Sequence, residues 1–171
     1  GIYVIIDFHI GTWDADLWNN DAKIDAIEYP DWWIAWFENI TLRYIDKPQV
    51  ALYDIFNEPP VEGQGYSKAQ LQEMWYSVSL RAVRAIHQVN PKVVVLVESI
   101  DLADAILFID SPLPEPNVVY AFHRYYYFDR GYEDYAKSYE QGNTETAISQ
   151  METLFNRIAF RMLDLGYPIM L

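Results

Sequence analysis

The chain has 171 residues, 51% of them apolar and 16% aromatic, which is enough to bury the core of one domain. Twelve basic residues against 25 acidic ones give a net charge of −13, which disfavours nucleic acid and anionic membrane surfaces as partners, because both bind clustered Lys and Arg. The absence of Cys excludes disulfides, thiolate catalysis and zinc–cysteine sites. No apolar run approaches the roughly 20 residues of a membrane helix, and no signal peptide is visible.

Five short runs rich in Val, Ile, Leu, Phe and Tyr predict β-strands. They are nearly continuous rather than alternating, which is typical of parallel strands buried on both faces. The runs are Ile2–Phe8, Val50–Phe56, Val93–Val97, Val118–Phe122 and Pro168–Leu171. Because the chain begins and ends within such runs, we expect it to be part of a longer domain.

Helical periodicity predicts a helix in each interval between these strands. The helices are Trp32–Ile45, Ser67–Val89, Asp101–Ile109 and Thr144–Leu165. Ser67 and Gln70 predict a capping box at the start of the second helix, and Gly166 predicts the end of the last one. Strands that alternate with helices indicate a parallel sheet of βαβ units, either doubly wound or a (β/α)8 barrel. No Gly-rich phosphate loop follows any strand, which removes the main support for nucleotide binding.

Each of the first four strands ends in polar residues of catalytic type. The four groups are Asp7-Phe8-His9, Asn57-Glu58-Pro59, Glu98-Ser99 and His123-Arg124-Tyr125. In a (β/α)8 barrel the active site is formed by residues at the carboxyl ends of several strands. The sequence therefore predicts that these groups meet at one end of the sheet.

Three of these groups resemble motifs of glycoside hydrolase family 5, the cellulase family. Tyr53-Asp54-Ile55-Phe56-Asn57-Glu58-Pro59 resembles its fourth strand, Ile5-Ile6-Asp7-Phe8-His9 its third strand, and His123-Arg124-Tyr125 the His-x-Tyr after its sixth strand. The motifs occur in family order over essentially the whole chain. The resemblance implies an α/β fold, a partial (β/α)8 TIM barrel with parallel strands 3 to 6 and the start of strand 7. Residues 1–171 would form a single partial catalytic domain, truncated at both ends.

By this resemblance Glu58 is the general acid/base of a retaining glycosidase. Its pKa should be raised by partial burial and by a neighbouring carboxylate. Pro59 is expected to hold Glu58 in an extended backbone conformation. Adjacent extended residues point to opposite faces, so Asn57 and Glu58 can share a site only if the strand kinks there.

The other site residues follow from the same resemblance. Asn57 would donate to the sugar 2-hydroxyl group, and His9 would contact the sugar. His123 and Tyr125 would hold the nucleophile, a Glu at the end of strand seven that we expect within about three residues beyond Leu171.

Further candidates contact substrate or support the site. Glu98 is a candidate substrate contact at the end of its strand, with a role beneath the catalytic residues equally open. Flat aromatic rings stack on sugar faces, which makes the loop residues Trp13, Trp18 and Tyr127 candidate sugar platforms. Asp7 and Asp54 lie inside strands and are expected to need buried partners. The predicted core of the first helix consists of Trp33, Trp36 and Phe37.

The resemblance implies an endo-β-1,4-glucanase or cellulase that acts on β-linked polysaccharide or oligosaccharide by double displacement, without cofactor or metal, and is secreted. Two alternatives remain open. A metal-dependent barrel hydrolase could use His9, Glu58 and His123 as ligands. A non-catalytic glycan-binding relative could keep the same motifs, because the second catalytic carboxyl group is not among the 171 residues.

Overall fold

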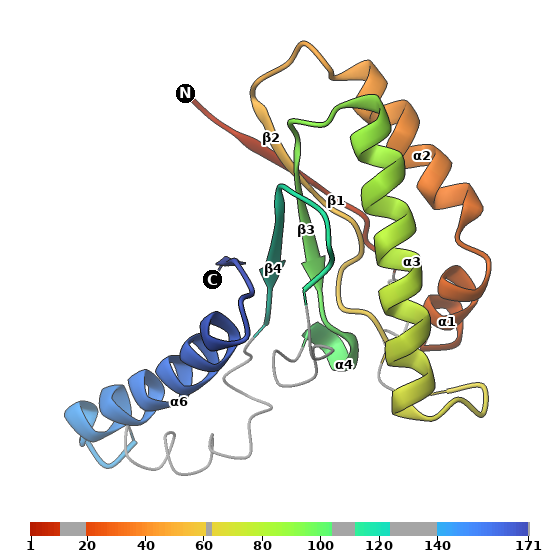
Figure 1. Cartoon of the computed structure of the whole chain (residues 1–171). Coiled ribbons are helices and arrows are strands. Elements are labelled where there is room, and N and C mark those ends of the chain that lie inside the picture. Colours follow the sequence, from red (N-terminus) through yellow and green to blue (C-terminus); the bar gives the residue numbers. More distant parts are fainter. Residues whose placement is uncertain (11–19, 61–62, 104–111, 124–139, 171) are drawn as a thin grey trace.

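A parallel sheet organises the part of the chain that the structure describes. The structure is a computed structural model that describes residues 1–10, 20–60, 63–103, 112–123 and 140–170 (Figure 1). The strands are β1 (Val4–Asp7), β2 (Val50–Asp54), β3 (Val94–Glu98), β4 (Val118–Ala121) and β5 (Ile169–Met170). Their order in the sheet is their order in the chain, β1-β2-β3-β4-β5, and every neighbouring pair is parallel. A doubly wound sheet reverses direction at a switch point, whereas a barrel progresses in one direction, so the predicted partial barrel is confirmed.

The helices follow the predicted pattern with one addition. They are α1 (Asn20–Glu28), α2 (Asp31–Arg43), α3 (Lys68–Val89), α4 (Ile100–Ala103) and α6 (Thr144–Asp164). Ser67 and Gln70 form the predicted capping box of α3, and Gly166 has the left-handed φ of 83° expected after α6. Helix α1 was not predicted. Helix α4 matches only the beginning of its predicted range, whose remainder lies outside the described residues.

The main core lies between the sheet and helices α1, α2 and α3, which cover one side of β1–β3 (Figure 1). Phe8 packs its ring against Trp33 and Phe37, both fully buried. Trp36 is 38% exposed, so its prediction as a core residue is wrong. Helical spacing gave the direction of the buried face of α2 correctly but overestimated its width.

The opposite face of the sheet carries a second, smaller cluster. Leu52, Leu96 and Ala121 pack together there, away from the helices. Side chains alternate along a strand, so residues two positions further on point to the same face. Those residues are Asp54 after Leu52, Glu98 after Leu96 and His123 after Ala121. The polar strand ends therefore continue the inner face of the barrel.

Strand β1 departs from the predicted burial. Val4 and Ile5 are 47% and 49% exposed, because β1 is an edge strand of the described sheet. The prediction of burial on both faces holds for β3, where four of five residues are buried, but not for β1. No helix in the described part of the chain is long and apolar enough to cross a membrane.

Candidate active site

Glu58 lies just beyond the carboxyl end of β2 and is 6% exposed. The backbone kinks there, since the φ of Glu58 is +49°, in the left-handed region that non-glycine residues rarely occupy. The kink required for Asn57 and Glu58 to share a site is present. The prediction that Pro59 holds Glu58 in an extended conformation is wrong, because contacts from other elements hold both polar groups of the Glu58 main chain. Its N–H donates to Glu98 Oε2 (2.7 Å), and its carbonyl oxygen accepts from Lys23 Nζ (2.5 Å).

His123 follows β4 and lies between two carboxyl groups. Its Nδ1 is 2.9 Å from Glu58 Oε1, and its Nε2 makes an ion-pair contact of 3.1 Å with Glu98 Oε1. The pKa of His123 is raised to about 10. Hydrogen bonding to Glu58 is the largest cause and hydrogen bonding to Glu98 the second, while burial acts in the opposite direction. At neutral pH the ring is therefore an imidazolium whose two N–H groups face oxygens of the Glu58 and Glu98 carboxyl groups.

Glu98 ends β3 and lies beneath the site. The residue is fully buried, with its main-chain carbonyl oxygen accepting from Trp75 Nε1 at 2.7 Å. One carboxylate oxygen accepts from the Glu58 N–H and the other faces His123. With 1% of its side chain exposed, Glu98 has no surface to offer a sugar. Its prediction as a substrate contact is corrected to the supporting role that the sequence left equally open.

Asp54 completes the polar layer on the inner face. Burial raises its pKa from 3.8 to about 9, with further contributions from the charge of Glu98, a hydrogen bond with Glu98 and the charge of Asp7. Asp54 is therefore protonated at neutral pH. The buried partner expected for Asp54 is Glu98.

Replacement of Asp54 by Asn should stabilise the complete catalytic domain at pH 8. A raised pKa means that the folded protein holds this proton where the unfolded chain has lost it. Asp54 thus lowers the free energy of unfolding progressively as pH rises from about 4 to about 9. Asn imitates the protonated carboxyl group, so the gain at pH 8 should exceed about 1 kcal/mol. Urea denaturation at pH 5 and pH 8 measures it, with the exposed Asp46 changed to Asn as control. A gain of equal size at both pH values would contradict the assignment.

A second chain of contacts begins at β1. His9 Nδ1 lies 3.1 Å from Asp7 Oδ2, and His9 Nε2 lies 3.4 Å from Asn57 Nδ2. Donation from Nδ1 to Asp7 leaves Nε2 to accept from the Asn57 amide. The side chain of His9 is 62% exposed, so its ring is accessible to a ligand at this end of the sheet.

The comparison with known proteins decides the family. The sequence model of Cellulase (glycosyl hydrolase family 5) matches residues 1–171. The chain belongs to glycosyl hydrolase family 5. Endoglucanase A of Evansella cellulosilytica is 33% identical over 132 residues, which are 73% of this chain and 22% of that protein.

Solved structures agree on the fold of this family 5 chain. An endoglucanase superposes with a TM-score of 0.68 at 16% identity, over 96% of this chain and 51% of its own. Thermotoga maritima Cel5A in complex with mannotriose superposes with a TM-score of 0.66 at 17% identity, over 96% and 52%. The chain thus spans about half the length of these solved structures.

The metal-site alternative conflicts with the geometry. Both ring nitrogens of His123 already face carboxylate oxygens, and His9 is oriented by Asp7 and Asn57. The ring nitrogens of both proposed histidine ligands are therefore already in contact with other side chains. The described residues contain no group of three or more His, Cys, Asp or Glu arranged to hold a metal ion.

The structure adds one residue that the sequence prediction missed. Lys23 is 6% exposed and lies three and four residues before the buried Ala26 and Ile27 in α1. A lysine at helical spacing with two core residues was the available signal. The predicted site residues Trp13, Trp18, Tyr125 and Tyr127 lie outside the described residues.

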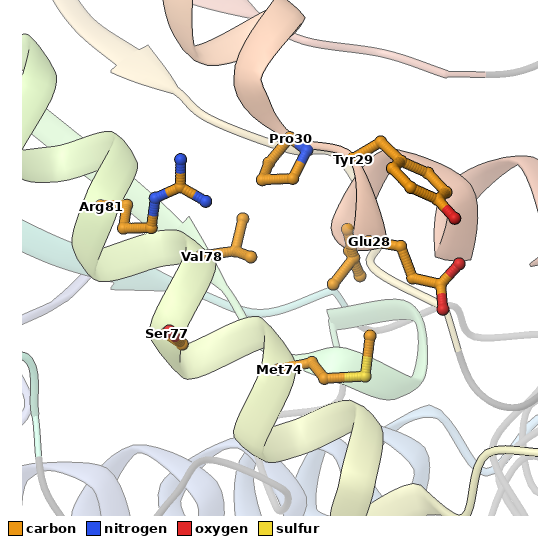
Figure 2. Close-up of a pocket in the computed structure, with 8 residues that line it drawn as sticks. Glu28, Tyr29, Pro30, Met74, Ser77, Val78 and Arg81 are labelled. Carbon is orange, nitrogen blue, oxygen red and sulfur yellow. The ribbon is translucent and has the colours of Figure 1, made fainter.

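A groove of about 370 Å³ lies elsewhere, between the α1–α2 turn and α3 (Figure 2). It is lined by Ile27, Glu28, Tyr29, Pro30, Met74, Ser77, Val78 and Arg81. None of the polar residues at the strand ends lines it. The groove belongs to the outer helical layer, and we assign the chemistry to the strand ends instead.

Proposed function

We propose that this chain supplies the acid/base half of the active site of a retaining endo-β-1,4-glucanase, within a single catalytic domain. The observation that carries the proposal is the buried carboxyl group of Glu58, held in a left-handed turn and in contact with the His123 imidazolium. Glu98 is too buried to act as the second carboxyl group. In this proposal the nucleophile is a Glu at the end of the strand that begins with β5.

Glu58 acts twice in the reaction. It first gives its proton to the glycosidic oxygen while the nucleophile attacks the anomeric carbon, so the aglycone leaves as an alcohol. It then takes a proton from the water that cleaves the glycosyl-enzyme. The N–H of His123 stabilises the carboxylate that forms after the first proton transfer.

The remaining residues bind the sugar in this proposal. Asn57 donates to the 2-hydroxyl group next to the reacting carbon, a hydrogen bond that strengthens in the transition state. His9, which is accessible, contacts the same sugar, and Tyr125 holds the nucleophile. His123, expected from the sequence to hold the nucleophile as well, has both ring nitrogens against Glu58 and Glu98 instead. The aromatic side chains Trp13, Trp18 and Tyr127 form stacking platforms along the glycan.

The proposed substrate is a β-linked glucan. The curated relative is an endoglucanase, and Thermotoga maritima Cel5A has been solved with cellobiose as well as with mannotriose. Hydrolysis of cellulose, mixed-linkage β-glucan and β-mannan by the full-length protein tests the proposal. Activity on mannan alone would change the sugar but keep the mechanism. We also propose secretion, because a polymeric glycan cannot cross a membrane intact.

Chelation of metal ions should leave hydrolysis unchanged, because every proposed step uses carboxyl groups. The measurement is the rate of polysaccharide hydrolysis after EDTA treatment and removal of the chelator by gel filtration. Loss of activity that zinc or manganese restores would support the metal-dependent alternative. If calcium restores the activity, the melting temperature is measured with and without calcium. A structural ion raises the melting temperature because it binds only the folded protein.

A further inference from the structure

Lys23 is a buried cation that the mechanism above does not use. It belongs to α1 and is 35 residues away in sequence from the residue it contacts. Its Nζ donates to the main-chain carbonyl oxygen of Glu58 at 2.5 Å. Burial lowers its pKa, while the carboxyl groups of Glu58 and Glu98 oppose that effect by attraction. A lysine that keeps its charge in such a place must be held by nearby negative groups.

The contact falls on the most unusual backbone in the site. A positive φ in a non-glycine residue persists only where surrounding contacts hold it. At Glu58 those contacts come from both sides of the same residue. Glu98 Oε2 accepts from the Glu58 N–H at 2.7 Å, and Lys23 Nζ donates to the Glu58 carbonyl oxygen. Each partner comes from a different element, β3 and α1, so neither depends on the local sequence around Glu58.

The direction of the Glu58 side chain follows from this backbone. The turn is what brings its carboxyl group within 2.9 Å of His123 Nδ1 rather than toward the helical core. A carboxyl group that acts as a general acid must be within hydrogen-bond reach of the atom it protonates. An error of about 1 Å in such a group costs about 100-fold in rate. A residue that fixes the Glu58 backbone therefore affects proton transfer without touching substrate.

We propose that Lys23 is a positioning residue for the general acid. Its hydrogen bond to the Glu58 carbonyl oxygen and the hydrogen bond from the Glu58 N–H to Glu98 together fix the backbone of Glu58. The inference rests on the proposed function, since it requires Glu58 to be the proton donor. It goes beyond that function by assigning a role to a residue outside the strand-end motifs. This role predicts that replacing Lys23 lowers kcat/KM most for substrates whose leaving group must be protonated.

The test compares aryl β-glycosides that differ in leaving group, in the full-length enzyme. Lys23→Met removes the ammonium group and keeps the length of the side chain. We expect kcat/KM for a phenyl glycoside, a poor leaving group, to fall on the order of 10- to 100-fold. For the 2,4-dinitrophenyl glycoside, which leaves without protonation, the loss should stay below about threefold. The Kd of an unreactive oligosaccharide should change by less than about twofold.

Two further variants make the result decisive. Lys47→Met is the matched control, because Lys47 is exposed and precedes β2 at the opposite end of the sheet; it should leave all values unchanged. Lys23→Gln keeps an N–H donor without the charge, and should recover part of the loss on the phenyl glycoside. If circular dichroism shows that Lys23→Met does not fold, Lys23→Gln is used for the comparison of the two glycosides instead.

Equal losses on both glycosides in folded Lys23 variants would overturn the inference, because a purely structural defect reduces all substrates alike. Glu58→Gln, measured on the same glycosides, distinguishes a failure of the Lys23 role from a failure of the proposed function. A steep dependence on leaving group in Glu58→Gln with none in the Lys23 variants removes the role of Lys23 only. A flat dependence in Glu58→Gln removes the proposed function and the inference together.

Discussion

Replacement of Glu58 by Gln is expected to reduce hydrolysis of unactivated polysaccharide by several orders of magnitude, about 10³-fold or more. Gln has the same shape and can still accept from the His123 N–H, so the site should fold and bind glycan. What it lacks is the proton for the leaving oxygen and the base for the second step. The measurement is kcat/KM on polysaccharide, with Kd for an oligosaccharide determined separately.

The two halves of the reaction should respond differently to this change. Substrates with good leaving groups should lose much less in the first step, because they leave without protonation. Added azide should accelerate the second step, because an anionic nucleophile needs no general base. Glu145→Gln, at an exposed position in the first turn of α6, serves as the control. Near-normal hydrolysis of polysaccharide by Glu58→Gln would remove Glu58 from the mechanism and favour the non-catalytic alternative.

The inner face of the site could be predicted from the strands themselves. The motifs identified Glu58 and His123, and the alternation of side chains along β3 puts Glu98 on the same face as Leu96, although the sequence-based prediction did not use it. The same alternation places Asp54 beside it. Alternation does not show how deeply an inward-pointing side chain is buried. Whether an inward carboxyl group reaches substrate or stays beneath the site depends on the neighbouring strands, and Glu98 proved to be fully buried.

Two features of the site depend on contacts between residues far apart in sequence. The rule for a residue before proline predicts an extended Glu58, but Lys23 and Glu98 hold the opposite sign of φ. Helix α1 was missed because it is nine residues long and its buried residues make only two turns of apolar pattern. The position of Lys23 could therefore not be read from local propensity.

Replacement of Glu98 by Leu is expected to be the most destabilising change in the site. Glu98 is fully buried, accepts the N–H of Glu58 and faces the imidazolium of His123. Leu leaves the N–H without its acceptor and the cation with one carboxylate partner fewer, beside a side chain that is itself fully buried. Removal of one member of a buried ion pair costs about 3–5 kcal/mol. Urea denaturation of the full-length protein at pH 7 measures the change in the free energy of unfolding.

Gln at position 98 separates the two contributions. Its amide oxygen can still accept from the Glu58 N–H, so Glu98→Gln should lose less than half as much stability as Glu98→Leu. It removes the negative charge, however, and the pKa of His123 should fall from about 10 toward its ordinary value. NMR titration of the His123 ring detects that change.

A double-mutant cycle with His123→Leu then tests whether the cost of Glu98→Leu comes from the unpaired cation. Replacing both members of a buried pair with apolar residues is often close to neutral, whereas removing one is not. The double variant should therefore be more stable than the sum of the two single changes predicts, by more than about 1 kcal/mol. Simple additivity, or a loss below about 1 kcal/mol for Glu98→Leu alone, would show that Glu98 does not hold this site together. In that case the left-handed turn at Glu58 would have to be maintained from the Lys23 side.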